Sequence, residues 1–118
     1  MNKIKILGIS KSSNHNVYTF RKNQEFIPAI MKFLLDLGCK DDNVPRFFYV
    51  SDKKYGEPIS GKYRKISEFE DQHYFFKLKD FGIDLVFAKN KVFLIINTKS
   101  DKQEFISNKI FSIFNKNK

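Results

Sequence analysis

Few side chains in this sequence are of the types that perform catalysis or bind metal ions. The histidines are His15 and His73, and the single thiol is Cys39. A zinc site would need carboxylates to complete its ligand set, and a Cys39–His73 nucleophile pair would need the fold to bring the two together. Their positions favour ordinary roles: Cys39 as a half-buried packing residue after a helix, and His73 as a hydrogen-bonding residue at the start of a strand.

Carboxylates cluster at Glu68, Glu70 and Asp71. Paired carboxylates can bind a metal ion or share a proton, which raises one pKa. In an extended chain, however, Glu68 and Glu70 would share the solvent face while Phe69 points inward, so a solvated surface is the better interpretation. The sequence also has no glycine-rich phosphate loop, HExxH motif or CxxC pair. We therefore expect no enzymatic activity, no cofactor and no metal site.

The segment from Ser51 to Ile66 is the candidate recognition surface. Its candidate partner-binding residues are Lys53, Lys54, Tyr55, Lys62, Tyr63, Arg64 and Lys65. The basic residues among them outnumber the acidic residues of the segment, Asp52 and Glu57, by three. Aromatic residues with basic neighbours can stack on nucleic-acid bases or anchor a protein interface. A polar loop without a binding role is the alternative.

The net charge of the whole chain is strongly positive. Lys and Arg number 22 against 13 Asp and Glu, giving a formal charge of +9. Such a surplus is typical of proteins that bind nucleic acid. Nearly all of it is lysine, however, and lysine lacks the planar fork with which arginine recognises phosphates and guanine. Lys, Asn, Ile and Phe also have A/T-rich codons, so base composition is an alternative source of the charge, and nucleic-acid binding ranks second to protein binding.

Length and composition indicate one soluble domain spanning residues 1–118. The chain is 42% hydrophobic and 16% aromatic, enough for a folded core. No apolar run approaches the roughly 18 residues of a membrane span, and Lys3 and Lys5 interrupt the start too early for a signal peptide. Cys39 alone cannot form an internal disulfide. We expect a cytoplasmic protein that does not bind membranes.

Alternation and turn residues predict elements in the first half of the chain. Residues 3–9 and 17–20 form a predicted β-hairpin. Residues 26–37 have the apolar spacing of a buried helical stripe, with Asn23 as N-cap and Gly38 after the last turn. Residues 46–50 are predicted to form a strand, and residues 62–66 a short edge strand or an extended arm.

The second half contains three strand-like runs, at residues 73–79, 83–88 and 92–98. Short turns separate them, which predicts an antiparallel meander. The last run is apolar on both faces, as expected for a central strand covered on both sides. A C-terminal helix follows, with Ile106 and Ile110 on one face. The predicted fold is α+β, an antiparallel sheet with a C-terminal meander packed by two helices.

The meander carries a resemblance to a known family. An aromatic strand, a turn, a Gly-Ile-x-Leu-x-Phe strand at residues 82–87 and the apolar run at residues 92–97 resemble a pattern in small bacterial immunity proteins. These proteins belong to contact-dependent growth inhibition and related polymorphic toxin systems. The resemblance covers about a quarter of the chain. It implies a protein without activity of its own, which neutralises a cognate toxin domain, often a nuclease, by stoichiometric binding. We expect the chain itself to be a monomer or a homodimer.

One property departs from the expectation for such proteins. Immunity proteins against nucleases are often acidic, whereas this chain is basic. The resemblance therefore implies a toxin with an acidic face, or binding through shape and through strand pairing at an open sheet edge.

Overall fold

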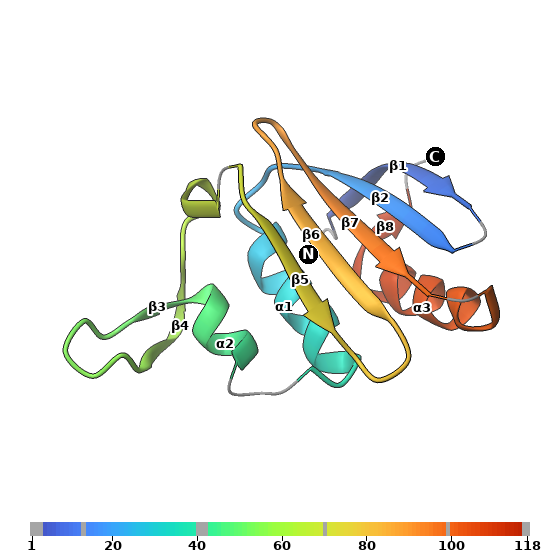
Figure 1. Cartoon of the computed structure of the whole chain (residues 1–118). Helices are drawn as coiled ribbons and strands as arrows, with labels where there is room; N and C mark the ends of the chain where they lie inside the picture. Colours follow the sequence, from blue (N-terminus) through green and yellow to red (C-terminus); the bar gives the residue numbers. More distant parts are fainter. Residues whose placement is uncertain (1–3, 13, 40–42, 70, 99, 117–118) are drawn as a thin grey trace.

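A computed structural model describes residues 4–12, 14–39, 43–69, 71–98 and 100–116 of the chain. Within these residues, helices cover one face of a predominantly antiparallel sheet, and a smaller two-stranded sheet extends to one side (Figure 1). The large sheet consists of β1 (Lys5–Lys11), β2 (His15–Arg21), β5 (His73–Lys77), β6 (Gly82–Phe87), β7 (Lys91–Asn97) and β8 (Asn115–Lys116). The small sheet consists of β3 (Tyr49–Ser51) and β4 (Pro58–Tyr63). The helices are α1 (Phe26–Asp36), α2 (Asn43–Phe48) and α3 (Ser100–Ile113), with a 3-10 turn, η1 (Ile66–Phe69). The expected α+β class is confirmed.

The large sheet joins two locally formed units. Its strand order is β5-β6-β7-β2-β1-β8. The predicted hairpin is β1–β2, with an irregularity between Ile6 and Gly8, and the predicted meander is β5–β6–β7. These units meet where β2 pairs antiparallel with β7 from His15↔Asn97 to Arg21↔Lys91. β8 adds to β1 in parallel.

The first long helix forms where its apolar spacing predicts it, but its N-terminal cap differs from the prediction. Glu25 occupies the cap position and its side chain makes no capping hydrogen bond. Asn23 lies in a preceding turn instead, where its side-chain oxygen accepts a hydrogen bond from the Glu25 N–H at 3.1 Å. The other end agrees with the prediction, because Gly38 has φ +94°, a conformation that side chains disfavour.

The predicted strand at residues 46–50 is wrong for most of its length. Residues 43–48 form α2, and only Tyr49 onwards is extended. Phe48 is fully buried, while the ring of Phe47 lies 4.5 Å from that of Tyr74 and 5.6 Å from that of Phe76. These contacts with β5 hold the short helix, although its aromatic residues have high strand propensity.

The core lies between the sheet and the two long helices, α1 and α3 (Figure 1). Alternate residues of β2, β6 and β7 point into it, and the apolar stripes of both helices cover them. Its fully buried members include Tyr18, Phe20, Phe26, Ile30, Leu85, Phe87, Leu94, Ile110 and Phe114. The Tyr18 hydroxyl of β2 reaches the Ser107 hydroxyl of α3 at 2.7 Å, so these two buried hydroxyl groups pair with each other.

The opposite face of the sheet is not covered by the helices (Figure 1). Phe93 and Ile95 of β7 lie on this open face and are only partly buried. The expectation that helices or other layers cover the last strand on both sides is therefore wrong, although β7 is central in the sheet. Its β-branched and aromatic residues fit the pleated surface of a sheet even where one side is open.

Candidate functional site

The predicted partner-binding residues all lie in one projecting segment. We call residues 49–65 the arm: it comprises β3, β4, the turn between them and the two residues after β4. The arm extends away from the large sheet beside α2 (Figure 1). The two strands pair antiparallel, Tyr49 with Tyr63 and Ser51 with Pro58, with an irregular register between these pairs.

The tip of the arm, residues 52–57, is ordered by Asp52. Its carboxylate accepts hydrogen bonds from the backbone N–H groups of Lys54 at 2.8 Å and Tyr55 at 3.3 Å. The Asp52 N–H also donates to the Glu57 carbonyl at 2.6 Å, and the Asp52 carbonyl accepts from the Gly56 N–H at 2.7 Å. Gly56 has φ +71°, as this turn requires. The turn is therefore fixed by hydrogen bonds between Asp52 and backbone groups of the turn, which leave the side chains of Lys53, Lys54 and Tyr55 exposed.

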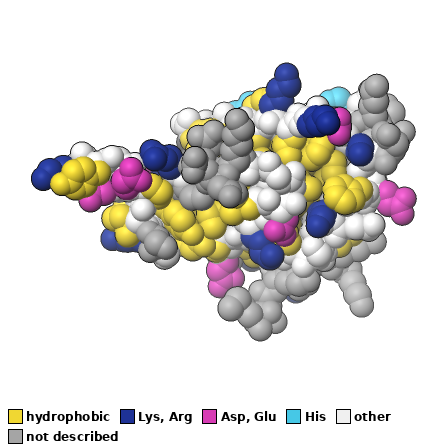
Figure 2. All heavy atoms as spheres, turned by 90° about the horizontal axis from the view of Figure 1, so that it is seen from below, with side chains coloured by type: hydrophobic (Ala, Val, Ile, Leu, Met, Phe, Trp, Pro, Cys, Tyr) yellow, Lys and Arg dark blue, Asp and Glu magenta, His cyan; other side chains and the backbone are white. Residues whose placement is uncertain are grey.

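The side chains of the tip form a mixed surface. Lys53 and Lys54 are exposed, and Tyr55 is 67% exposed with the Lys54 ammonium 5.2 Å from its ring centroid. Ile59, farther along the arm, is 41% exposed. In the space-filling view the far end of the arm presents hydrophobic, basic and acidic side chains together (Figure 2). The tip offers an aromatic anchor with charges around it.

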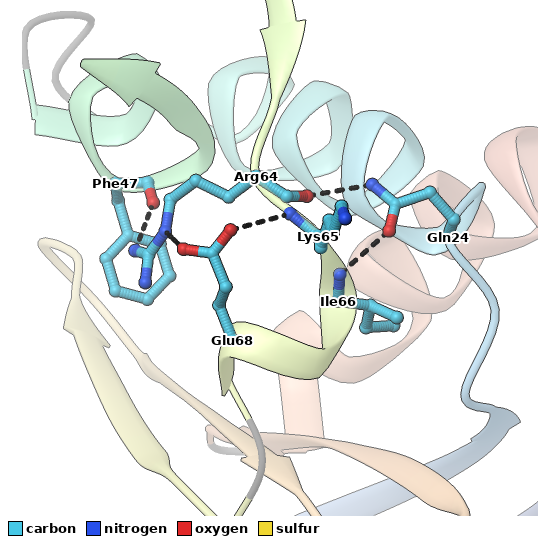
Figure 3. Close-up of polar contacts among 6 residues, drawn as sticks. All are labelled: Gln24, Phe47, Arg64, Lys65, Ile66 and Glu68. Atoms are coloured by element: carbon cyan, nitrogen blue, oxygen red, sulfur yellow. Dashed lines mark hydrogen bonds and ion pairs between the residues drawn. The ribbon is translucent and has the colours of Figure 1, made fainter. Parts of the chain in front are cut away.

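The base of the arm is held by Arg64 (Figure 3). Its Nη1 donates to the Phe47 carbonyl at 2.9 Å, and its Nε lies 3.2 Å from Glu68 Oε1. The guanidinium carbon also lies 4.2 Å from the ring centroid of Phe69, within the range of a cation–π contact. Arg64 therefore connects α2, the arm and η1.

Gln24, just before α1, ties the arm to the helical layer (Figure 3). Its amide nitrogen donates to the Arg64 carbonyl at 2.8 Å, and its amide oxygen accepts from the Ile66 N–H at 2.7 Å. Together these bonds satisfy two backbone groups at the point where the arm rejoins the body. The arm thus projects from a fixed base.

The seven predicted residues divide into two groups. Lys53, Lys54, Tyr55, Lys62 and Lys65 are exposed, whereas Tyr63 and Arg64 are partly buried. The Tyr63 and Tyr49 ring centroids are 4.9 Å apart, and burial followed by the hydrogen bond with Tyr49 raises the pKa of Tyr63. The structure thus gives Tyr63 and Arg64 packing contacts within the chain and leaves the side chains of the other five exposed.

Replacing Glu68 with glutamine should loosen the base of the arm. Glu68 accepts from the Lys65 N–H at 3.1 Å, and this bond, followed by the Arg64 side chain, lowers the pKa of Glu68 below its ordinary value of 4.5. Because the pair is half exposed, we expect Glu68→Gln to reduce the free energy of unfolding by about 0.5–1 kcal/mol at pH 7, measured by urea denaturation.

The effect should depend on pH in a defined direction. A carboxyl group whose pKa is lowered on folding contributes stability above its unfolded-state pKa and loses that contribution as the pH falls through its folded-state value. The difference between Glu68→Gln and the unsubstituted protein should therefore shrink below pH 4.5. An equal difference at pH 7 and pH 3 would show that the carboxylate charge does not matter.

The other residues singled out for chemistry lie apart from the arm tip. His73 Nε2 is 2.8 Å from Asp84 Oδ1, and Asn97 donates to the other Asp84 oxygen, all on the open face of the sheet. Cys39 is half-buried against the core on the opposite side, and burial raises the pKa of its thiol. The structure thus does not bring His73 and Cys39 together. Glu70 lies outside the described residues, and Glu68 belongs to η1 rather than to an extended chain.

Two features of the site were not predicted from the sequence. One is the role of Asp52 in ordering the tip, although an aspartate shortly before Gly56 is a sequence signal for a turn. The other is the exposed ring of Phe75, 57% exposed on β5 at the edge of the sheet. Alternation along the strand is a signal that Phe75 and its two neighbours face opposite sides of the sheet, but it does not show that the strand lies at an edge.

Among the residues that the structure describes, no group of three or more His, Cys, Asp or Glu side chains could hold a metal ion. Their helices are also too short or too polar to cross a membrane. In the comparisons, no family model, curated protein or solved structure matches this chain significantly.

Proposed function

We propose that this protein binds a bacterial toxin domain stoichiometrically and neutralises it without any enzymatic activity of its own. The observation that carries the proposal is the arm, whose exposed tip is ordered by Asp52 and held at a fixed base by Arg64 and Gln24. The resemblance of the meander to immunity proteins supplies the class of partner.

The physical chemistry of the tip suits a protein interface. A tyrosine whose backbone is already ordered, as that of Tyr55 is by Asp52, loses less entropy on binding, and Tyr is enriched among residues that dominate binding energy. Lys53, Lys54 and the exposed lysines nearer the base would favour an acidic surface on the toxin and accelerate encounter at low salt. Ile59 would extend the apolar part of the contact.

Tyr55→Ala should weaken binding to the toxin domain encoded beside this protein by about 30-fold, the effect of losing a binding hot spot of about 2 kcal/mol. The double variant Lys53→Glu, Lys54→Glu should mainly slow association, and its effect should fade as salt increases. Both can be measured by surface plasmon resonance. Phe105→Ala, which removes an exposed aromatic residue from α3 rather than from the arm, is the matched control and should bind normally.

Protection of cells gives the second readout. Co-expression of the unsubstituted protein should abolish the toxicity of that domain, and Tyr55→Ala should restore part of it. Undiminished toxicity in the presence of the unsubstituted protein would reject the proposed function. Full binding by both tip variants would reject the arm as the contact surface.

Binding of single-stranded nucleic acid is the second candidate function. It is favoured by the open face of the sheet, where the exposed Phe75 lies on β5 with Lys77 and the partly exposed Phe93 lies on β7 with Lys91. Arg21 of the neighbouring strand β2 lies opposite Lys91. Aromatic side chains with nearby cations are the elements on which bases stack. This candidate predicts affinity for a poly-dT oligonucleotide that falls steeply between 50 and 200 mM salt. No binding at the lower salt concentration would exclude it.

A further inference from the structure

The outer edge of β5 is open for pairing. β5 is the last strand of the large sheet on one side and pairs only with β6. Two backbone hydrogen bonds show which residues face β6. The Phe87 N–H donates to the Gln72 carbonyl, and the Leu78 N–H donates to the Phe81 carbonyl, both at 2.9 Å. Since backbone groups of an antiparallel strand alternate in direction, the N–H and C=O groups of His73, Phe75 and Lys77 point outward. No partner for these groups occurs among the described residues.

The edge formed by β5 is unusual because an exposed aromatic side chain lies on it. Natural sheets cover or blunt their edges to prevent unwanted pairing, yet the Phe75 ring at this edge is 57% exposed. The ring lies across Gly82 of β6, where a Cβ atom would come within 2.7 Å of it. The Phe75 ring therefore occupies the space that a side chain at position 82 would fill, and more than half of Phe75 is exposed to solvent.

An open cleft of about 640 Å³ lies along the same edge. It is lined by residues at the end of α1, in α2, and from β5 through the following turn: Leu37, Gly38, Cys39, Val44 and 75–81. Its apolar walls and the exposed Phe75 ring flank the row of outward backbone groups. Lys77, Lys79 and Asp80, all exposed, line its rim, so the two lysines outnumber the single carboxylate there.

We infer that an extended segment of the toxin domain pairs with β5 as an additional strand of the sheet. Successive side chains of such a segment point to opposite sides. One set would cover Phe75 and the other would enter the cleft beside Leu37 and Val44. The lysines at the rim select a segment in which acidic residues flank the apolar ones. The inference rests on the proposed function and names a second contact, separate from the arm.

Proline at position 77 provides a selective test. Because the Lys77 N–H points outward, Lys77→Pro removes a donor from the open edge without removing a hydrogen bond to β6, and edge positions tolerate proline. Lys77→Ala removes the same side chain and charge but keeps the N–H. We expect Lys77→Pro to bind the adjacent toxin domain at least tenfold more weakly than Lys77→Ala, with both variants unfolding at similar urea concentrations.

Hydrogen exchange identifies the contact directly. The amides of Phe75 and Lys77 should exchange rapidly in the free protein and become protected in the complex of the unsubstituted protein with the toxin domain. Equal affinity of the two variants, or unchanged exchange at these amides, would overturn the strand pairing and leave the proposed function intact. Failure of the unsubstituted protein to bind would overturn both. A concentration-dependent dimer that Lys77→Pro abolishes would instead identify a second copy of this chain as the occupant, and would also overturn the inference.

Discussion

Replacing Phe26 with alanine should lower the free energy of unfolding by about 3–5 kcal/mol, the largest stability effect we expect from one substitution. Phe26 is fully buried at the start of α1. Its ring centroid lies 5.1 Å from that of Phe20, 5.9 Å from that of Phe114 and 6.4 Å from that of Phe87. The substitution would remove the ring that joins the helical layer to both units of the sheet and leave a cavity that stiff neighbours cannot fill.

Urea denaturation followed by circular dichroism measures this effect. Phe105→Ala, on the exposed side of α3, should change the unfolding free energy by less than about 1 kcal/mol, because surface substitutions have small effects. If Phe26→Ala does not fold, Phe26→Leu keeps the test usable and should give a smaller loss of the same sign. A loss below about 1 kcal/mol for Phe26→Ala would mean that the core repacks around the missing ring.

Replacing Arg64 with alanine should cost about 2–3 kcal/mol and release the base of the arm. Arg64 makes charge-assisted bonds to the Phe47 carbonyl and to Glu68 and stacks on Phe69. Bonds of this kind contribute about 1.5–3 kcal/mol when partly shielded from water, and loss of the side chain leaves the Phe47 carbonyl without this donor. Lysine cannot provide the same fork of donors, so Arg64→Lys should restore little of the stability.

Hydrogen exchange separates local loosening from general destabilisation. In Arg64→Ala, the backbone amide of residue 64, which donates to the Phe48 carbonyl at 2.8 Å in the unsubstituted protein, should exchange faster relative to amides of β7. Lys62→Ala, an exposed basic residue of the same arm, is the control and should leave both sets unchanged. Faster exchange of β7 amides to the same extent would show that Arg64 stabilises the whole fold and not the arm in particular.

The parts of the fold that depend on local patterns could be predicted from the sequence. The meander follows from alternation between short turns, and α1 follows from an apolar stripe that ends at Gly38. α2 could not be predicted, because a run of six residues is too short for its periodicity to distinguish helix from strand. Its conformation depends on Phe47 and Phe48 packing against distant residues of β5 and η1.

The candidate site was predictable as a segment but not as a set of contacts. Exposed lysines and Tyr55 stand out from composition alone. Tyr63 and Arg64 belong to the same run of sequence, yet their partners, such as Gln24 for the Arg64 carbonyl, come from elsewhere in the chain. The open edge of β5 was likewise not predictable, because strand order depends on the long-range pairing of β2 with β7.

That long-range pairing also sets the order in which the chain can fold. The hairpin and the meander each close through short turns, whereas pairing β2 with β7 requires a long loop to close first, which is the slow kind of event in sheet formation. The tip of the arm lies inside that loop and makes no strand pair with either unit. Substitutions in the tip should therefore leave the rate of sheet assembly unchanged, so the surface proposed to meet a partner can vary independently of folding.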